Sequence, residues 1–199
     1  MDFTKKYLKY KSKYLNLKKQ FAGAAAEKEF TSSSGLVLFN SRDGWRVVME
    51  ILNPKKTSKC IFPATGERVE KVSLPGGGKK PGENLFQAFK REYKEEIGTE
   101  LPWLETTTQY YDNEFYKTRN YYSPISDNTQ RIVYNIDNVL YEETIGIIFP
   151  KLKHIKEQIQ KANGGIVFIQ FERNTYCIRR CVVDSLQKMF NLNLLDRYL

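Results

Sequence analysis

The sequence contains few of the residues on which several kinds of functional site depend. Its single histidine, His154, cannot form a histidine-based metal centre and argues against a Ser-His hydrolase. Its three cysteines are an odd number and lack the further ligands that a zinc site needs. We therefore expect Cys60, Cys177 and Cys181 to be reduced thiols rather than parts of a disulfide framework.

Long apolar runs are absent as well. No stretch approaches the roughly 20 apolar residues that span a bilayer. The N-terminus also has no continuous apolar segment of the kind that signal peptides carry. The sequence therefore predicts a soluble protein of the cytoplasm with no transmembrane segment.

Length and composition favour one folded domain with appendages. The chain has 199 residues, of which 41% are hydrophobic and 14% aromatic, so it can bury a core. The formal net charge is +9, and residues 2–20 supply most of it, with seven lysines against one aspartate. The positive charge is thus concentrated in the N-terminal segment.

This N-terminal segment has the pattern of a basic amphipathic helix, which we expect over residues 1–20. Apolar side chains recur there every three or four residues, at Phe3, Tyr7, Tyr10, Tyr14 and Leu17. Such a helix can pack on the domain, bind nucleic acid or lie on a membrane surface, and the sequence leaves these roles open. The small and polar residues 21–34 are expected to form a linker to a domain at 35–199.

The most informative stretch lies at residues 74–99 and reads LPGGGKKPGENLFQAFKREYKEEIGT. Its glycines let backbone groups approach a phosphate or a metal ion closely. Residues 84–97 contain no glycine or proline, and their apolar residues recur at helical intervals, at Phe86, Phe89, Tyr93 and Ile97. The stretch therefore predicts a glycine loop followed by an amphipathic helix.

Three acids of the predicted helix crowd one turn. Glu92, Glu95 and Glu96 stand at i, i+3 and i+4, where like charges repel. A divalent cation would relieve this repulsion, and carboxylate oxygens are ligands suited to Mg²⁺ or Mn²⁺. A diphosphate or triphosphate would complete the coordination shell of such an ion, so the pattern favours metal-dependent phosphate chemistry.

The spacing of this stretch resembles the Nudix box, G-x5-E-x7-R-E-U-x-E-E-x-G-U, in which U is a bulky aliphatic residue. All seven fixed residues are present, at Gly77, Glu83, Arg91, Glu92, Glu95, Glu96 and Gly98. Tyr93 and Thr99 depart from the box at its two U positions. The resemblance implies a metal-dependent hydrolase that cleaves diphosphate linkages in nucleotide-diphosphate substrates.

The resemblance also implies roles for the box residues. Glu92 and Glu96 would be the principal metal ligands, with Glu95 and the Gly77 carbonyl as further candidates. Arg91 would orient a carboxylate. Glu83 would lie near the metal ions in a lesser role, although an acid at a helix start is equally expected from the helix dipole alone.

A general base is also required, and the sequence leaves its identity open. Asp137, Glu142 and Glu143 follow a predicted strand at residues 131–136. We favour Glu143 and then Glu142, because these two stand just before an apolar run, although a pair of acids in a loop is also typical of solvated surface.

For the fold, the resemblance implies an α/β/α sandwich with a mixed β-sheet, preceded by the basic helix. The patterns predict a hairpin around Asp43 and Gly44 and further strands and helices that follow in order. These are strands near 61, 69–74, 107–117, 130–136 and 166–171, and helices at 84–97, 151–162 and 178–190. The aromatic segment 110–122 can either stack a base or pack in a hairpin.

Three functions are compatible with the sequence. The leading one is hydrolysis of the mRNA 5′ cap, with the basic helix holding capped RNA. Residues 2–20 support it further because they resemble the Lys/Tyr-rich leaders of large cytoplasmic DNA virus proteins, which would place the enzyme in a host cytoplasm. The alternatives are hydrolysis of a small nucleotide, nucleotide sugar or inositol pyrophosphate, and an inactive module that binds RNA or a partner.

Overall fold

The computed structural model describes residues 30–125 and 143–199. The predicted basic helix, most of the predicted linker, the strand at 131–136, Asp137 and Glu142 lie outside the described residues. Thr31–Leu199 forms one compact unit. Its elements are β1 (Ser32–Ser41), β2 (Gly44–Val47), β3 (Met49–Leu52), β4 (Cys60–Ile61), β5 (Arg68–Val69), β6 (Lys71–Ser73), β7 (Gly76–Gly78), α2 (Leu85–Ile97), β8 (Gln109–Asn113), β9 (Thr118–Pro124), β10 (Thr144–Ile148), α4 (Leu152–Ala162), β11 (Phe168–Phe171), β12 (Asn174–Ile178), α5 (Arg180–Asn191) and η1 (Asp196–Tyr198).

The strands form two mixed sheets and one small hairpin. In the first sheet the order is β2-β1-β9-β8, and β7 pairs with the first part of β1. β1 runs parallel to β9 and antiparallel to β2 and β7. The second sheet has the order β10-β3-β6-β12-β11, with β6 and β12 parallel. β4 and β5 pair with each other.

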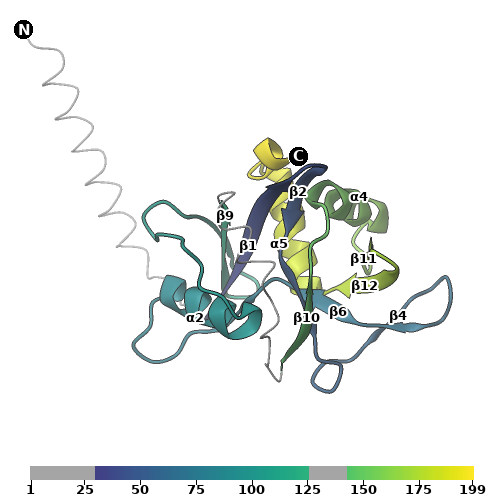
Figure 1. Ribbon diagram of the computed structural model, residues 1–199, viewed down its shortest axis with the longest axis horizontal. Coiled ribbons are helices and arrows are strands. Elements are labelled where there is room, and N and C mark those ends of the chain that lie inside the picture. The colour runs from purple at the N-terminus through teal and green to yellow at the C-terminus, as the bar shows by residue number, and fades with distance from the viewer. Residues whose placement is uncertain (1–29, 126–142) are drawn as a thin grey trace, which may run out of the picture. The chain divides into compact units, whose positions relative to one another are not determined.

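β1 is buried on both faces, which explains its continuous apolar sequence. Leu36 and Leu38 belong to one core cluster, whereas Val37 and Phe39 belong to the other, as the alternation of a strand requires. The first cluster is completed by α4 and α5 and the second by α2. Figure 1 shows α2 beside β1, with α4 and α5 on the other side of the strands. The predicted α/β/α sandwich with mixed sheets is confirmed.

α2 begins and ends where its capping residues place it. The Asn84 side chain accepts a hydrogen bond from the Gln87 N–H, and the Gln87 side chain accepts one from the Asn84 N–H. At the other end Gly98 adopts the left-handed conformation at φ 78°, and its N–H donates to the Lys94 carbonyl. This reciprocal capping fixes where the helix begins and therefore which face of it carries the acids of the box.

The predicted apolar face of α2 is confirmed. Phe86, Phe89, Tyr93 and Ile97 are all buried, and Tyr93 fills its U position as a fully buried side chain. The helix comes very close to β1 at Gly35, where an added Cβ would lie 2.0 Å from the Phe89 ring. The missing side chain of Gly35 therefore sets the distance between helix and sheet.

Several other predicted elements agree with the structure, whereas the predicted strand near 107–117 is the hairpin of β8 and β9, and β1 begins at Ser32 within the predicted linker. The hairpin at Asp43 and Gly44 joins β1 and β2, and the predicted helices at 151–162 and 178–190 correspond to α4 and α5. Among the described residues, no helix combines the length and apolar character that crossing a membrane requires. Within the aromatic segment, which forms the β8–β9 hairpin, Tyr121 and Tyr122 pack in the core.

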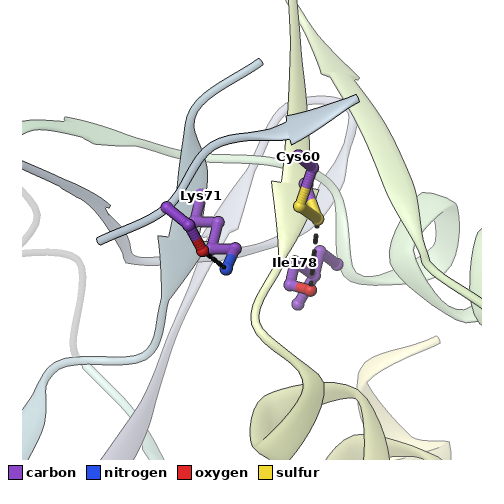
Figure 2. The surroundings of a disulfide bond; sticks show 5 residues. Cys60, Lys71 and Ile178 are labelled. Carbon is purple, nitrogen blue, oxygen red and sulfur yellow. Dashed lines mark hydrogen bonds between the residues drawn. A yellow bond between two sulfur atoms is a disulfide. The ribbon is translucent and has the colours of Figure 1, made fainter. Parts of the chain in front are cut away.

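One cysteine prediction is wrong. Cys60 and Cys177 form a disulfide between β4 and β12, and Figure 2 shows its surroundings. β12 pairs with β6 through Cys177 and Lys71, which brings Cys177 close to the β4–β5 hairpin. Because 117 residues separate the two cysteines, this pairing depends on long-range strand order and is invisible in the sequence. Cys181 remains a free thiol.

The close approach at Gly35 yields a stability prediction. Gly35→Ala should displace the buried Phe89 ring and reduce the free energy of unfolding by about 1–3 kcal/mol, as overpacking of a tight core does. Urea denaturation measures the change. Gly78→Ala is the matched control, because its added Cβ meets no atom within 4 Å. An unchanged midpoint for Gly35→Ala would show that α2 is not held at this distance.

Candidate active site

The glycine strand β7 forms one wall of the site. It pairs with the serines at the start of β1, residues 32–34, which the sequence analysis assigned to the linker. Gly76 has φ +151°, and a Cβ there would lie 2.2 Å from the Ser33 carbonyl oxygen. Its N–H donates to Glu96 Oε2 at 2.8 Å. Only glycine permits this approach, so β7 brings a backbone donor directly to an acid of α2.

Gly77 makes room for a second acid. A Cβ on this residue would lie 2.5 Å from Glu92 Cδ and 2.6 Å from Glu92 Oε1. The Glu92 carboxylate thus occupies the space that any other residue at position 77 would fill. The glycine loop and the acidic helix of the sequence pattern are therefore in direct contact.

Arg91 binds every acid of the box except Glu96. Its Nε donates to Glu83 at 2.8 Å, and its Nη1 donates to Glu92 at 2.6 Å and to Glu95 at 3.0 Å. Its Nη2 donates to the Gly78 carbonyl at 2.9 Å and to Glu83 at 3.1 Å. These contacts engage all five N–H groups of the guanidinium. Arg91 therefore has no donor left for a substrate phosphate.

Charge pairing at Arg91 has the expected electrostatic effect. Hydrogen bonds from Arg91, and then from the Lys80 N–H, hold the pKa of Glu83 well below its usual range. The same bond to Glu83, followed by the interaction with Glu92, raises the pKa of Arg91. Glu83 thus acts as a charged anchor for Arg91.

Sequence analysis missed a further acid, Glu50. It lies on β3, is only 2% exposed, and accepts a hydrogen bond of 2.6 Å from Thr144 Oγ1 on β10. Burial raises the pKa of Glu50, and the charges of Glu143 and Glu92 raise it further, whereas the Thr144 bond and the positive charge of Arg179 lower it. The available signal was an acid within the apolar run WRVVMEIL.

Glu96 is the second buried acid. It is 6% exposed, and burial followed by the charge of Glu50 raises its pKa, against the opposing hydrogen bond from the Gly76 N–H. Glu92 and Glu143 act in the same direction as Glu50. β3, which lies in the second strand of the predicted hairpin, and the predicted helix thus place two acids close together in a weakly solvated site, although Glu50 was not among the predicted site residues.

Glu95 and Glu143 lie at the exposed side of this group. Glu95 is shared between Arg91 and Lys80, whose Nζ lies 3.7 Å from its carboxylate. The Glu143 side chain is 69% exposed and lies 3.5 Å from Lys56 Nζ. Because its charge still acts on Glu50 and Glu96, Glu143 is within electrostatic reach of the buried pair. His154 lies elsewhere, on α4.

A pocket of about 460 Å³ adjoins β7. Its described lining comes from the start of β1, from β7, from β9 and from the start of α5. Serine, threonine and asparagine side chains and two arginines supply its polar groups, and this lining contains no acid. A cleft of this size suits a small organic ligand.

The sequence profile of the NUDIX domain matches residues 32–154, which include β7, α2 and both buried acids. This match covers more than half of the chain. The chain belongs to the NUDIX family. The resemblance found in the box is therefore confirmed, and the protein is a pyrophosphohydrolase, as predicted.

Several solved NUDIX structures are similar to this chain, at low sequence identity. One is an Ap4A hydrolase of C. elegans in a binary complex, with 15% identity, a TM-score of 0.46, and coverage of 82% of this chain and 98% of that chain. Another is a NUDIX hydrolase from Nitrosomonas europaea, with 15% identity, a TM-score of 0.44, and coverage of 82% and 90%. A third is the NUDIX domain of Shewanella oneidensis NrtR complexed with ADP ribose, with 14% identity, a TM-score of 0.43, and coverage of 87% and 95%. A search of curated proteins gave no match.

NUDIX hydrolases generally use divalent metal ions, and the chemistry of this site fits one. Carboxylates and backbone carbonyls are hard oxygen donors. Burial, followed by the charges of neighbouring acids, raises the pKa of Glu96, and burial likewise raises the pKa of Glu50, which is the direction that a bound cation would oppose. Within residues 30–125 and 143–199, no three His, Cys, Asp or Glu side chains are grouped so that they could hold a metal ion. The box acids instead accept hydrogen bonds from Arg91 and from the Gly76 N–H.

Contact between Gly77 and Glu92 yields a prediction for activity. Gly77→Ala should push the Glu92 carboxylate aside and reduce turnover about 100-fold, which is the scale of a 1 Å displacement in a catalytic site. Hydrolysis of a nucleoside-diphosphate-linked substrate measures the change. Gly78→Ala, at the neighbouring residue with open space around its Cβ, should lose far less. Equal turnover of the two variants would rule out this role for Gly77.

Proposed function

We propose that this protein hydrolyses a diphosphate linkage in a nucleoside-diphosphate-linked substrate with the help of Mg²⁺ or Mn²⁺. One observation carries the proposal. The buried acids Glu50 and Glu96 lie together beside the glycine strand β7, and Glu92 packs on the same strand. Buried carboxylates whose negative charge few positive groups offset favour the binding of a divalent cation together with its anionic ligand.

In this proposal the box residues divide the work. Glu92 and Glu96 would hold the cation, and Glu95 and the Gly77 carbonyl would be further ligands. Arg91 orients Glu92 and Glu95 through its hydrogen bonds. When bound, a divalent cation lowers the pKa of a coordinated water and neutralises charge on the diphosphate. Glu143, which is exposed and near the buried pair, accepts the proton of the attacking water.

For the substrate, capped mRNA is our first candidate, because residues 2–20 carry seven lysines and clustered lysines attract phosphate backbones. Cleavage within the cap would release 7-methyl-GDP. A small nucleotide, a nucleotide sugar or an inositol pyrophosphate would satisfy the same acids. These candidates differ in the group attached to the diphosphate, and the carboxylates do not contact that group.

The metal assignment is tested at Glu96. Glu96→Gln replaces one carboxylate of the buried pair by an amide and should reduce Mg²⁺-dependent turnover by at least about two orders of magnitude. It should also weaken Mn²⁺ binding followed by electron paramagnetic resonance. Glu100→Gln is the control, because this glutamate is exposed and forms an ion pair with Lys94 on the surface. Near-normal turnover in Glu96→Gln would overturn the assignment.

The substrate is tested with RNA labelled in its cap. The protein and Mg²⁺ should release 7-methyl-GDP, and Glu96→Gln should not. Absence of release from an enzyme that cleaves a diadenosine polyphosphate would exclude decapping and leave the small-molecule class.

The same RNA tests the basic N-terminal segment. Removing residues 1–20 should weaken RNA binding and flatten its dependence on salt, because fewer lysines would displace counterions. Cleavage of a diadenosine polyphosphate, which does not need this segment, serves as the control for the truncated protein. Equal RNA binding at every salt concentration would exclude the segment as an RNA-binding arm.

A further inference from the structure

Among the residues that the structure describes, Arg179 differs from Arg91 and Arg180 because its side chain has no hydrogen-bonding or ion-pair partner. It directly follows β12, is exposed, and its side chain makes no hydrogen bond or ion pair with another residue that the structure describes. Arg91 is fully engaged by acids and a carbonyl. Arg180 donates to Asp184 and to the carbonyls of Gly164 and Gly165. Within the described part of the chain, no residue binds the guanidinium of Arg179, whose five N–H groups can serve a ligand.

Strand pairing places Arg179 next to the buried acids. Ile178 pairs with Val72 on β6, and the Arg179 N–H donates to the Val72 carbonyl at 2.9 Å. On the other side of β6, Ser73 pairs with Glu50. The backbones of Arg179 and Glu50 are therefore two strand spacings apart, roughly 10 Å. An extended arginine side chain reaches much of that distance, and the charge of Arg179 does act on Glu50.

Arg179 also lines the 460 Å³ pocket that shares β7 with the acids. Beyond the two arginines, the polar lining is made of hydroxyl and amide groups. Ser34 Oγ donates to Asn120 Oδ1 at 2.8 Å, and the hydroxyls of Ser32 and Thr118 lie 2.6 Å apart. The Ser33 hydroxyl is buried and has no hydrogen-bond partner among the described residues. These groups can exchange hydrogen bonds with the hydroxyls of a sugar.

Features that would recognise a base are scarce in this pocket. Tyr116 is the one aromatic residue among the described residues of the lining, and its hydroxyl donates to Asp184 at 2.7 Å. Stacking of a base requires an accessible ring face, and tight reading of a base requires fixed donors and acceptors. A cationic pocket without acids instead attracts a phosphate and its pentose.

We propose that Arg179 binds a phosphate of the substrate diphosphate and that the adjoining pocket holds the pentose attached to it, with the base left outside. This inference rests on the proposed function. It assigns to Arg179 the positioning of the substrate. Arg91 cannot take this role, because all its N–H groups already donate to acids and a carbonyl. It also implies that the enzyme requires a nucleoside diphosphate but distinguishes bases weakly.

Binding of α,β-methylene-ADP, which is not cleaved, tests the role of Arg179. In calorimetry with Mg²⁺ present, Arg179→Gln should weaken binding about 10-fold to 100-fold, the scale of a charge-assisted hydrogen bond. The affinity of Arg179→Lys should lie between those of Arg179→Gln and the unmodified protein, because lysine keeps the charge but lacks the planar guanidinium. Arg173→Gln, an exposed arginine away from the site, removes the same charge and should bind as the unmodified protein does. Equal affinity of Arg179→Gln and Arg173→Gln would overturn the proposal.

Two further probes test the content of the pocket. Methylenediphosphonate, which lacks the pentose, should bind at least about 10-fold more weakly than α,β-methylene-ADP, because the sugar hydrogen bonds are missing. Replacing the adenine by uracil in α,β-methylene-UDP should change the affinity less than about 3-fold. A change above about 10-fold on this replacement would mean that the pocket reads the base, and would overturn its assignment to the pentose.

Failure of this inference and failure of the proposed function have different signatures. An enzyme that cleaves diphosphates while Arg179→Gln binds α,β-methylene-ADP normally keeps the function and loses the inference. A protein that binds this probe through Arg179 but cleaves no capped RNA, dinucleotide or nucleotide sugar keeps the inference and loses the function.

Discussion

The approach of the glycine strand β7 to helix α2 is the constraint on which the site depends. A backbone N–H of Gly76 meets Glu96, and the bare Cα of Gly77 leaves room for Glu92. This contact requires that β7 pair with β1 and that α2 pack on β1 at Gly35. The two glycines of β7 thus allow Glu92 and Glu96 of α2 to lie directly against the backbone of this strand.

The acids around this contact differ in how far positive groups offset their charge. Arg91 neutralises the acids at the rim of the site, so that Glu83 remains ionised in the protein alone. From the described residues, the buried acid Glu50 accepts a hydrogen bond from a hydroxyl and Glu96 accepts one from a backbone N–H. Burial and mutual repulsion oppose the ionisation of these two acids, so a bound cation would stabilise their charged form. The outer acids do not need such a cation, because Arg91 already pairs with them.

Local patterns were sufficient to predict α2 and its acids. Phe86, Phe89 and Ile97 show helical spacing, and the box residues lie within about twenty-five positions of one another, so no knowledge of distant contacts was needed. Glu50, Arg179 and the Cys60–Cys177 disulfide were beyond the reach of this reasoning. Each acquires its surroundings from the pairing of β3, β6 and β12, which are distant in the sequence. An isolated acid or arginine carries no local sign of such neighbours.

β1 couples the two cores to the site through its register. Its serines pair with β7, and its next residues alternate between the core on the side of α2 and the core on the side of α4 and α5. Inserting or deleting one residue between Ser34 and Leu36 would exchange Leu36 and Leu38 with Val37 and Phe39 across the strand. Side chains of this strand can therefore be exchanged one at a time, but its length cannot change without disrupting the pairing with β7 and the packing of both cores.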